Sequence, residues 1–310
     1  MVQSAIQTIL RIGSRGSPLA LVQAREVRDC LVAAGVNPGR IEIVVIRTTG
    51  DTVPGPLADA GGKGLFTKEI EDALLAGRID LAVHSSKDVP AVLPERLVLA
   101  AFLPREDPRD AFISRKAKTL PELPRGAVIG TASPRRAALV KRMRPDAEVV
   151  TLRGNVETRL RKLEAGEVDA TLLAVAGLKR LGLLSAATSI LEPEEFLPAV
   201  GQGAIGLETR VDDDATRALV AAINDADTAT ALTAERAFLD VLDGSCRTPI
   251  GGHARVAGGR LRFRGIIVKP DGSAAFDVAR EGSPEQAAEL GADAGRELRN
   301  RASADFFVRA

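Results

Sequence analysis

Strand-like and helix-like stretches alternate along the first part of the chain. Residues 41–46 are almost all apolar, which is typical of a strand buried on both faces of a sheet. Upstream, Ser17 and Pro18 supply an N-cap and a pre-set first turn, and Gly35 is suited to ending the helix that they begin. This alternation predicts a mainly parallel sheet. Its expected elements are strands at 9–14, 41–46 and 80–84 and helices at 17–35 and 67–76.

The same alternation restarts beyond Pro104 and Pro108, which we interpret as a crossing between two lobes. Residues 203–208 are again strand-like and are expected to return to the first sheet. The expected elements of the second lobe are strands at 127–130, 148–152 and 170–175 and helices that begin at 133 and cover 156–165.

The pattern changes near Asp225, where a helix at 228–242 precedes three strand-like runs and a last helix at 284–300. We therefore predict an α/β protein with two similar lobes around a cleft, plus a small α+β C-terminal domain. The expected domains are residues 1–103 with 203–222, residues 104–202, and residues 223–310.

Composition narrows the possible classes of protein. The 42 basic residues nearly balance 41 acidic ones, and Trp and Tyr are missing, so we expect no nucleic-acid partner. No apolar run approaches the roughly 18 residues of a membrane span. Residues 1–15 do not resemble a secretory signal. Two cysteines, Cys30 and Cys246, make no disulfide framework, so we expect a cytoplasmic protein with no membrane partner.

Arginine is concentrated where strands lead into helices. The chain has 33 Arg and nine Lys, an excess that codon bias alone also explains. Parallel strand ends and helix N-termini favour anions, and the guanidinium group binds carboxylates through paired hydrogen bonds. We therefore predict a cleft that binds a polyanion, with solvated surface arginines as the alternative. The residues at these turns are Arg15 and Ser17, then Thr131, Ser133, Arg135 and Arg136, then Arg153 and Arg159.

A second group of candidate residues follows the strand at 80–84. Asp88 can stabilise a developing cation or move a proton, and Lys87 beside it can hold an anion. The alternative is a helix-capping aspartate with a solvated lysine. His84 and His253 are the only histidines and the cysteines are far apart in sequence, so we expect no metal site.

Two glycine-containing loops complete the candidates. Residues 49–64, with five Gly and two Pro, are interpreted as a mobile loop. Gly64 directly follows Lys63, which departs from the GxxxxGK[ST] spacing and excludes an ATPase loop. In the other loop, Cys246 lies beside Arg247, which favours the reactive thiolate, whereas Cys30 falls in an apolar helix.

Together these segments resemble the porphobilinogen deaminase (hydroxymethylbilane synthase) family through nearly the whole chain. The C-terminal strands and helix match only loosely. The motifs that carry the resemblance, in the family's order, are RIGSRGSPLA at 11–20, GGKGLFTKE at 61–69, HSSKDVP at 84–90, GTASPRR at 130–136, LRGN at 152–155, GQG at 201–203 and GSCRTP at 244–249.

The resemblance implies two lobes like those of type II periplasmic binding proteins and a third domain carrying the cysteine. It implies a covalent dipyrromethane cofactor, held as a thioether on Cys246. Four porphobilinogen units are then joined head to tail with loss of ammonia, and hydrolysis releases the tetrapyrrole hydroxymethylbilane. Asp88 is suited to the pyrrole N–H groups and to the positive charge that develops there.

By the same resemblance, a set of side chains divides between cofactor and substrate. We expect a monomer that binds porphobilinogen. The cofactor would be held by Lys87, Thr131, Ser133, Arg135 and Arg136, and the substrate by Arg15, Ser17, Gln23, Phe66, Arg153, Arg159 and Gln202.

Two alternatives belong to other classes of protein. A two-lobe, periplasmic-type protein that binds a small anion without catalysis would suit the lobes, although the missing secretory signal and Cys246 weigh against it. A transcriptional effector-binding module would also suit them, but no helix-turn-helix domain precedes the first lobe. Both alternatives predict reversible binding without release of ammonia.

Overall fold

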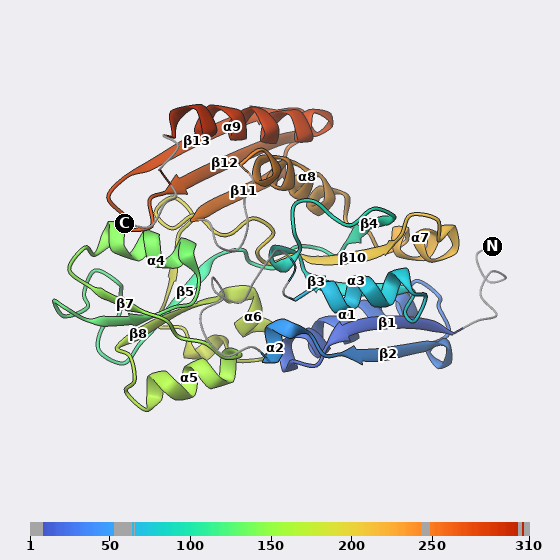
Figure 1. The fold of residues 1–310 in the computed structure, drawn as a ribbon, viewed down its shortest axis with the longest axis horizontal. Helices are drawn as coiled ribbons and strands as arrows, with labels where there is room; N and C mark the ends of the chain where they lie inside the picture. Colours follow the sequence, from blue (N-terminus) through green and yellow to red (C-terminus); the bar gives the residue numbers. More distant parts are fainter. Residues whose placement is uncertain (1–8, 53–63, 65, 243–248, 303–305, 307–310) are drawn as a thin grey trace. The chain divides into compact units, whose positions relative to one another are not determined.

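A computed structural model describes residues 9–52, 64, 66–242, 249–302 and 306 (Figure 1). The chain divides into two compact units, each described here by itself. Unit 1 comprises residues 1–55, 59–106 and 204–229, and unit 2 comprises residues 56–58, 107–203 and 230–310. Unit 1 thus follows the first expected domain closely. Unit 2 holds most residues of the other two expected domains, so the division into three domains stays a prediction.

Unit 1 is built on a five-stranded sheet of order β2-β1-β3-β10-β4. β1 pairs in parallel with β2 and β3, whereas β10 runs antiparallel to both of its neighbours. This pairing confirms that the late strand returns to the first sheet. The strands are Leu10–Arg15 (β1), Ile41–Ile46 (β2), Leu81–Ser85 (β3), Leu97–Phe102 (β4) and Ile205–Arg210 (β10).

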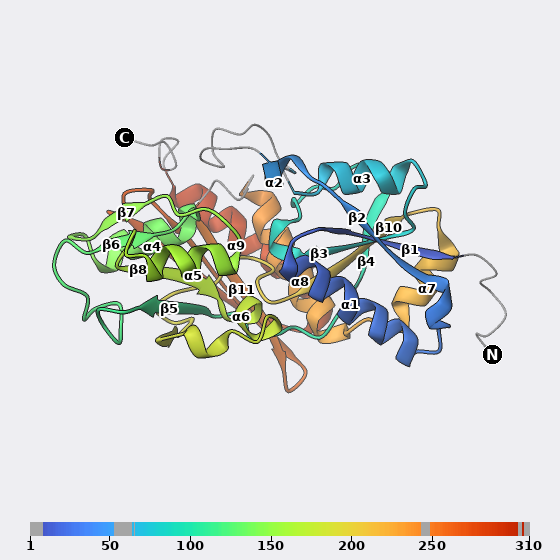
Figure 2. The same ribbon diagram turned by 90° about the horizontal axis from the view of Figure 1, so that it is seen from below.

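Helices cover both faces of this sheet (Figure 2). On one face, Val27 and Leu31 of α1 and Val220 of α7 join a core with Ile12 and Leu207. On the other face, α3 packs against a separate apolar cluster. The helices of unit 1 are Pro18–Ala33 (α1), Thr49–Thr52 (α2), Lys68–Leu75 (α3) and Asp214–Ala221 (α7), and Ala226–Val241 (α8) leads into unit 2.

Unit 2 contains a second five-stranded sheet, of order β7-β6-β8-β5-β9. β6 is parallel to β7 and β8, and β5 is antiparallel to β8 and β9. α4 packs on one face, while α5 and α6 pack on the other. The elements are Asp110–Ser114 (β5), Val128–Gly130 (β6), Pro134–Met143 (α4), Glu148–Val150 (β7), Val156–Glu164 (α5), Ala170–Ala174 (β8), Val175–Arg180 (α6) and Ser189–Leu191 (β9).

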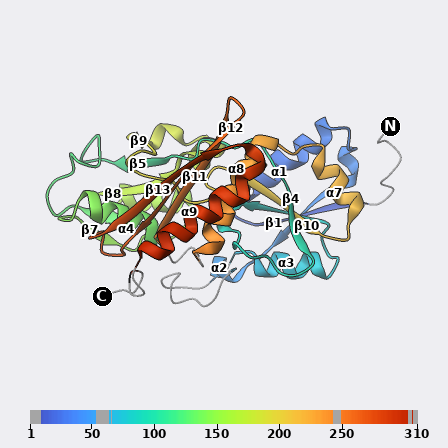
Figure 3. The same cartoon turned by 90° about the horizontal axis from the view of Figure 1, so that it is seen from above.

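The C-terminal part of unit 2 is an antiparallel sheet of order β11-β12-β13, which α9 crosses on one side (Figure 3). Phe238 of α8 packs on Phe263 of β12, with ring centroids 5.0 Å apart. A Cβ on Gly291 of α9 would overlap the Ala234 carbonyl, so the close approach of α9 to α8 requires glycine there. The elements are Ile250–Ala257 (β11), Arg260–Val268 (β12), Ala275–Gly282 (β13) and Ala287–Arg301 (α9).

The structure confirms the α/β fold class with a small α+β C-terminal part and corrects the prediction in detail. The prediction of a loop at 49–64 is wrong at its start, because residues 49–52 form the helical turn α2. Residues 53–63 of that predicted loop lie outside the described residues. Sequence reasoning missed β4, β5, β9, α6 and α7. β5 follows the segment 104–108, which we interpreted only as a crossing between the lobes. A short apolar strand has little periodicity of its own by which to recognise it.

Candidate active site

Asp88 lies just beyond the carboxyl end of β3, the position that its sequence predicts. A short 3₁₀ turn, Ser86–Asp88 (η2), begins directly after the strand. The Ser86 N–H donates to the Ala204 carbonyl at 3.0 Å, which ties this turn to the segment before β10. Asp88 and Lys87 are half-buried, so both side chains keep some access to solvent.

Other predicted residues gather at the same edge of the first sheet. The Arg15 guanidinium, at the end of β1, lies over the Phe66 ring at 4.3 Å from its centroid, a cation–π contact. The buried Gln23 amide exchanges hydrogen bonds with the Ser85 hydroxyl at 2.9 and 3.1 Å. The structure thus gives Gln23 a positioning role at the end of β3. Ser17 caps α1 by accepting from the Ala20 N–H.

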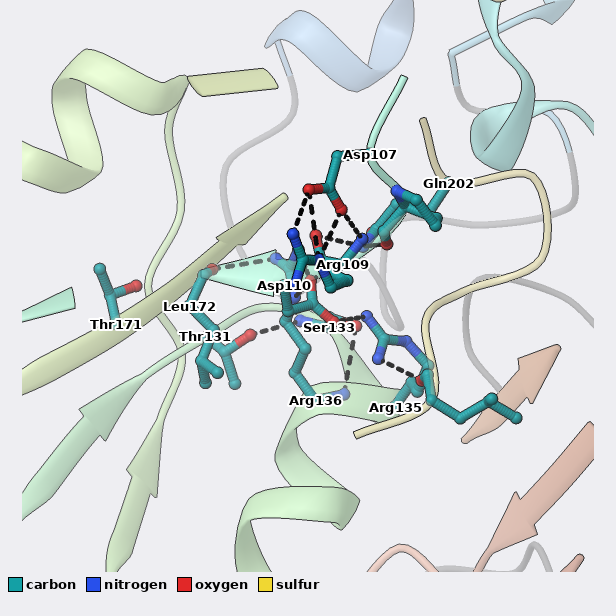
Figure 4. A network of polar contacts seen from close by, with 12 residues as sticks. Asp107, Arg109, Asp110, Thr131, Ser133, Arg135, Arg136, Thr171, Leu172 and Gln202 are labelled. Carbon is teal, nitrogen blue, oxygen red and sulfur yellow. Dashed lines mark hydrogen bonds and ion pairs between the residues drawn. The ribbon is translucent and has the colours of Figure 1, made fainter. Parts of the chain in front are cut away.

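In unit 2 the most buried ion pair joins the start of α4 to β5 (Figure 4). Asp110 accepts from Arg135 Nη2 at 2.7 Å through one oxygen and from Arg136 Nη2 at 2.6 Å through the other. The backbone oxygens of Leu197 and Leu172 take further guanidinium donors of Arg135 and Arg136, respectively. Asp110 is fully buried and the two arginines are 3% and 5% exposed.

The charges of this cluster do not cancel. Burial alone would raise the pKa of Asp110, but Arg135 and Arg136 hold it well below its usual range. One carboxylate then faces two guanidinium groups, and burial lowers the pKa of Arg135. Arg135 Nε is buried and has no hydrogen-bond partner. An excess positive charge with an unused donor is the buried arrangement that an anionic ligand would complete.

Three other predicted residues belong to this cluster. Gln202 donates from Nε2 to the Pro108 carbonyl at 2.7 Å and to Asp110 Oδ1 at 3.0 Å. Ser133 caps α4 by accepting from the Arg136 N–H, and Thr131 accepts from the Ser133 N–H at 3.2 Å. The sequence therefore predicted residues that the fold brings together, although Gln202 here supports Asp110.

Arg153 and Arg159 lie at the next strand-to-helix turn. Arg159 Nε donates to the Gly154 carbonyl at 2.8 Å, and Asn155 caps α5 by accepting from the Thr158 N–H. Gly154 has φ +123°, a backbone conformation that favours glycine. The turn therefore has a fixed local geometry, with Arg153 half-buried beside it.

Cys246, the predicted attachment point, lies outside the described residues. Cys30 is half-buried in α1, and burial raises the pKa of its thiol, which disfavours the reactive thiolate. Within the described residues, no helix is both long and apolar enough to cross a membrane. The same residues contain no group of three or more His, Cys, Asp or Glu side chains placed to hold a metal ion.

Sequence reasoning missed Asp110, the centre of the unit 2 cluster. An aspartate next to the apolar run Ala111-Phe112-Ile113 is the signal that could have found it. A charged residue at the start of a buried strand needs a partner of opposite charge, and arginine pairs were already expected nearby.

The fold and these side chains define an α/β protein with a buried pair of arginines that share a single carboxylate. A model for the "Porphobilinogen deaminase, dipyromethane cofactor binding domain" matches residues 10–218, and one for the "Porphobilinogen deaminase, C-terminal domain" matches residues 229–300. The chain belongs to the porphobilinogen deaminase family, whose members are transferases with a dipyrromethane cofactor.

Individual relatives agree with this assignment. The porphobilinogen deaminase of Nitrobacter hamburgensis is 63% identical over 99% of this chain and 98% of its own length. That of Paracoccus denitrificans is 56% identical over 97% of each chain. Among solved structures, a periplasmic substrate-binding protein from Coxiella burnetii has 17% identity and a TM-score of 0.43, covering 69% of this chain and 92% of its own. Because this TM-score is low, the sheet topology described above is the basis for the fold class.

Proposed function

We propose that this chain carries out the family's reaction with the residues described above. Four porphobilinogen units are joined head to tail, with release of ammonia, and hydrolysis then releases hydroxymethylbilane. The observation that supports this most is the buried cluster of Asp110, Arg135 and Arg136, because it carries an excess positive charge. Family membership favours this transferase over both binding-protein alternatives.

The residues of unit 2 fit a carboxylate-bearing cofactor. Arg135 Nε is an unused buried donor, and Ser133 and Thr131 lie at the N-terminus of α4, where the helix dipole favours negative charge. Thr131, Ser133, Arg135 and Arg136 would hold the carboxylates, and the family resemblance also assigns Lys87 to the cofactor. The cofactor supplies a nucleophilic pyrrole carbon as the primer.

In unit 1, Asp88 would stabilise the positive charge that develops on porphobilinogen as ammonia leaves. A half-buried carboxylate held beyond a strand end is pre-placed for that charge, so no rearrangement is needed during the reaction. Arg15, Ser17 and Phe66, with Gln23 nearby, would receive the substrate at the same edge of this sheet. The family resemblance also assigns Arg153, Arg159 and Gln202 to the substrate.

Intact-protein mass tests the cofactor assignment directly. Wild-type protein should exceed its sequence mass by two pyrrole units, and Cys246→Ser should have the bare sequence mass and make no tetrapyrrole. Cys30→Ala is the matched control and should stay loaded and active. A dipyrromethane mapped to the Cys30 peptide would refute the attachment site. Measured ammonia and hydroxymethylbilane from added porphobilinogen test the activity.

The oligomeric state and the cellular location also stay proposals. We expect the protein to be a monomer, which light scattering after size exclusion measures. We expect it to be cytoplasmic, which fractionation of the source cells with a cytoplasmic marker measures.

A further inference from the structure

Three ionisable side chains are buried together beneath α3 in unit 1. Glu71 of α3 is 6% exposed, His84 of β3 is 5% exposed and Glu208 of β10 is 0% exposed. The register pairs Gly206 with His84, so His84 and Glu208 project from the same face of the sheet. Ala82, on that face, packs in the apolar cluster of α3. The three groups are thus enclosed between the helix and the sheet.

Some polar atoms of these three side chains have no hydrogen-bond partner. His84 Nε2 and Glu208 Oε2 are 3.0 Å apart, so one carboxylate oxygen has a partner. Glu208 Oε1 and Glu71 Oε1 are buried and have no hydrogen-bond partner. Two ionised carboxylates beside one imidazole would leave an uncompensated negative charge in a low-dielectric interior, which is costly. A proton on one of them lowers that negative charge by one and supplies a donor.

Several effects favour a proton on Glu71. Burial raises its pKa, and repulsion from Glu208 and Asp72 raises it further, against the opposing effects of Thr67 and His84. The nearest cation on β10, Arg210, is already engaged. It donates to the Leu74 and Ile79 carbonyls and pairs with Asp213 and Asp80.

We propose that Glu71 is a positioning residue, protonated in the folded protein at neutral pH, which links α3 to the His84–Glu208 pair at the end of the strand that leads to Asp88. The link to Asp88 rests on the proposed function, whereas the bound proton is a property of the fold alone.

The backbone shows why this group would position Asp88. His84 is the next-to-last residue of β3, and the 3₁₀ turn that ends with Asp88 begins two residues later. A Cβ on Gly206 would lie 3.0 Å from Ser86 Oγ, so the turn sits directly on β10. Charge repulsion between Glu71 and Glu208 would therefore push apart the elements that support this turn.

The bound proton can be counted. Unfolding at pH 7 should release about one proton more from wild-type protein than from Glu71→Gln, because the unfolded glutamate ionises. Unfolding calorimetry in buffers with different ionisation enthalpies gives this number. Asp72→Asn removes an exposed carboxylate from the same helix, 53% exposed and paired with Lys68, and should release as many protons as wild type. Equal release from wild type and Glu71→Gln would overturn the proposal.

The sign of the pH dependence follows from the raised pKa. Between the ordinary glutamate pKa and the raised folded value, the folded protein binds more protons than the unfolded chain. Wild-type stability relative to Glu71→Gln therefore falls as the pH rises through that window. Urea unfolding across the pH range measures this slope, and a difference independent of pH contradicts the bound proton.

The positioning role has its own readout. We expect Glu71→Gln, which mimics the neutral acid, to keep kcat within about twofold at neutral pH, while Glu71→Ala lowers kcat and leaves KM near its wild-type value. At alkaline pH, wild type and Asp72→Asn should lose kcat as Glu71 ionises, and Glu71→Gln should not. Coinciding kcat profiles for wild type and Glu71→Gln would overturn the positioning role. Absence of product from wild type would instead refute the proposed function and leave the proton count intact.

Discussion

The two five-stranded sheets have the same layout of strands but oppositely charged buried sites. In each sheet the fourth strand runs antiparallel to the third and carries a fully buried carboxylate, Glu208 on β10 and Asp110 on β5. Glu208 shares its surroundings with an imidazole and a second carboxyl group, Glu71. Asp110 faces two guanidinium groups. The strand therefore places the carboxylate, and its neighbours decide which charge is in excess.

This difference separates two kinds of buried polar site. The group in unit 1 has surplus acid and unpaired carboxylate oxygens, so a proton completes it. The cluster in unit 2 has surplus base and an unpaired guanidinium nitrogen, so an anion completes it. The group in unit 1 only has to support the turn that carries Asp88, and a bound proton is enough for that. The cluster in unit 2 has positive charge in excess and is therefore suited to an anionic ligand.

The largest effect on stability is expected at Asp110. Asp110→Asn leaves Arg135 and Arg136 buried without their counter-charge, which should cost about 3–5 kcal/mol of unfolding free energy and empty the cofactor site. Urea unfolding and intact mass measure both effects. Asp212→Asn, in an exposed pair with Arg96, is the control and should cost at most about 1 kcal/mol. Equal losses for the two variants would contradict the role of burial.

Asp88→Asn should have the next largest effect, on rate instead of stability. The amide keeps the shape but not the charge, and loss of one pre-placed electrostatic group costs roughly 10²–10³ in kcat. Because Asp88 is half-buried, its unfolding midpoint should stay at the wild-type value. Near-normal ammonia release by the folded variant would remove Asp88 from the mechanism.

Two arginines of unit 2 should separate cofactor from substrate. Arg135→Ala should purify with an incomplete cofactor, and Arg153→Ala should purify loaded but elongate slowly. Intact mass and single-turnover elongation measure the two effects. Arg161→Ala, an exposed arginine of α5, should match wild type in both. A fully loaded Arg135→Ala beside an empty Arg153→Ala would reverse the assignment.

The smallest effect on stability is expected at Glu208, and it tests the comparison of the two sheets most directly. Glu208→Gln changes the buried carboxylate of the corresponding strand in the other sheet, yet it should cost only about 1 kcal/mol or less. The amide keeps the shape of the side chain and can still bond His84. Urea unfolding of the two variants under the same conditions measures the contrast. A loss as large as that of Asp110→Asn would show that Glu208 is needed as a charge.

Much of the fold was predictable from local pattern. The N-caps Ser17, Ser133 and Asn155 each accept a bond from the first turn of their helix, because capping depends on neighbours three residues away. The strand at 41–46 was predictable from its apolar run. β5 was not, since its burial depends on pairing with β8 and β9, which no local signal encodes.

The sequence by itself determined which residue types stand at each strand-to-helix turn, and therefore predicted Asp88 and the arginines of both lobes. Only the tertiary structure decided their partners. Asp110 meets Arg136 across 26 positions of the chain, and His84 meets Glu208 across 124. A buried charge depends on whatever the folded chain places within a few ångströms of it, because the low-dielectric interior makes an unpaired charge costly. Sequence spacing fixes no such distance until the sheets have formed.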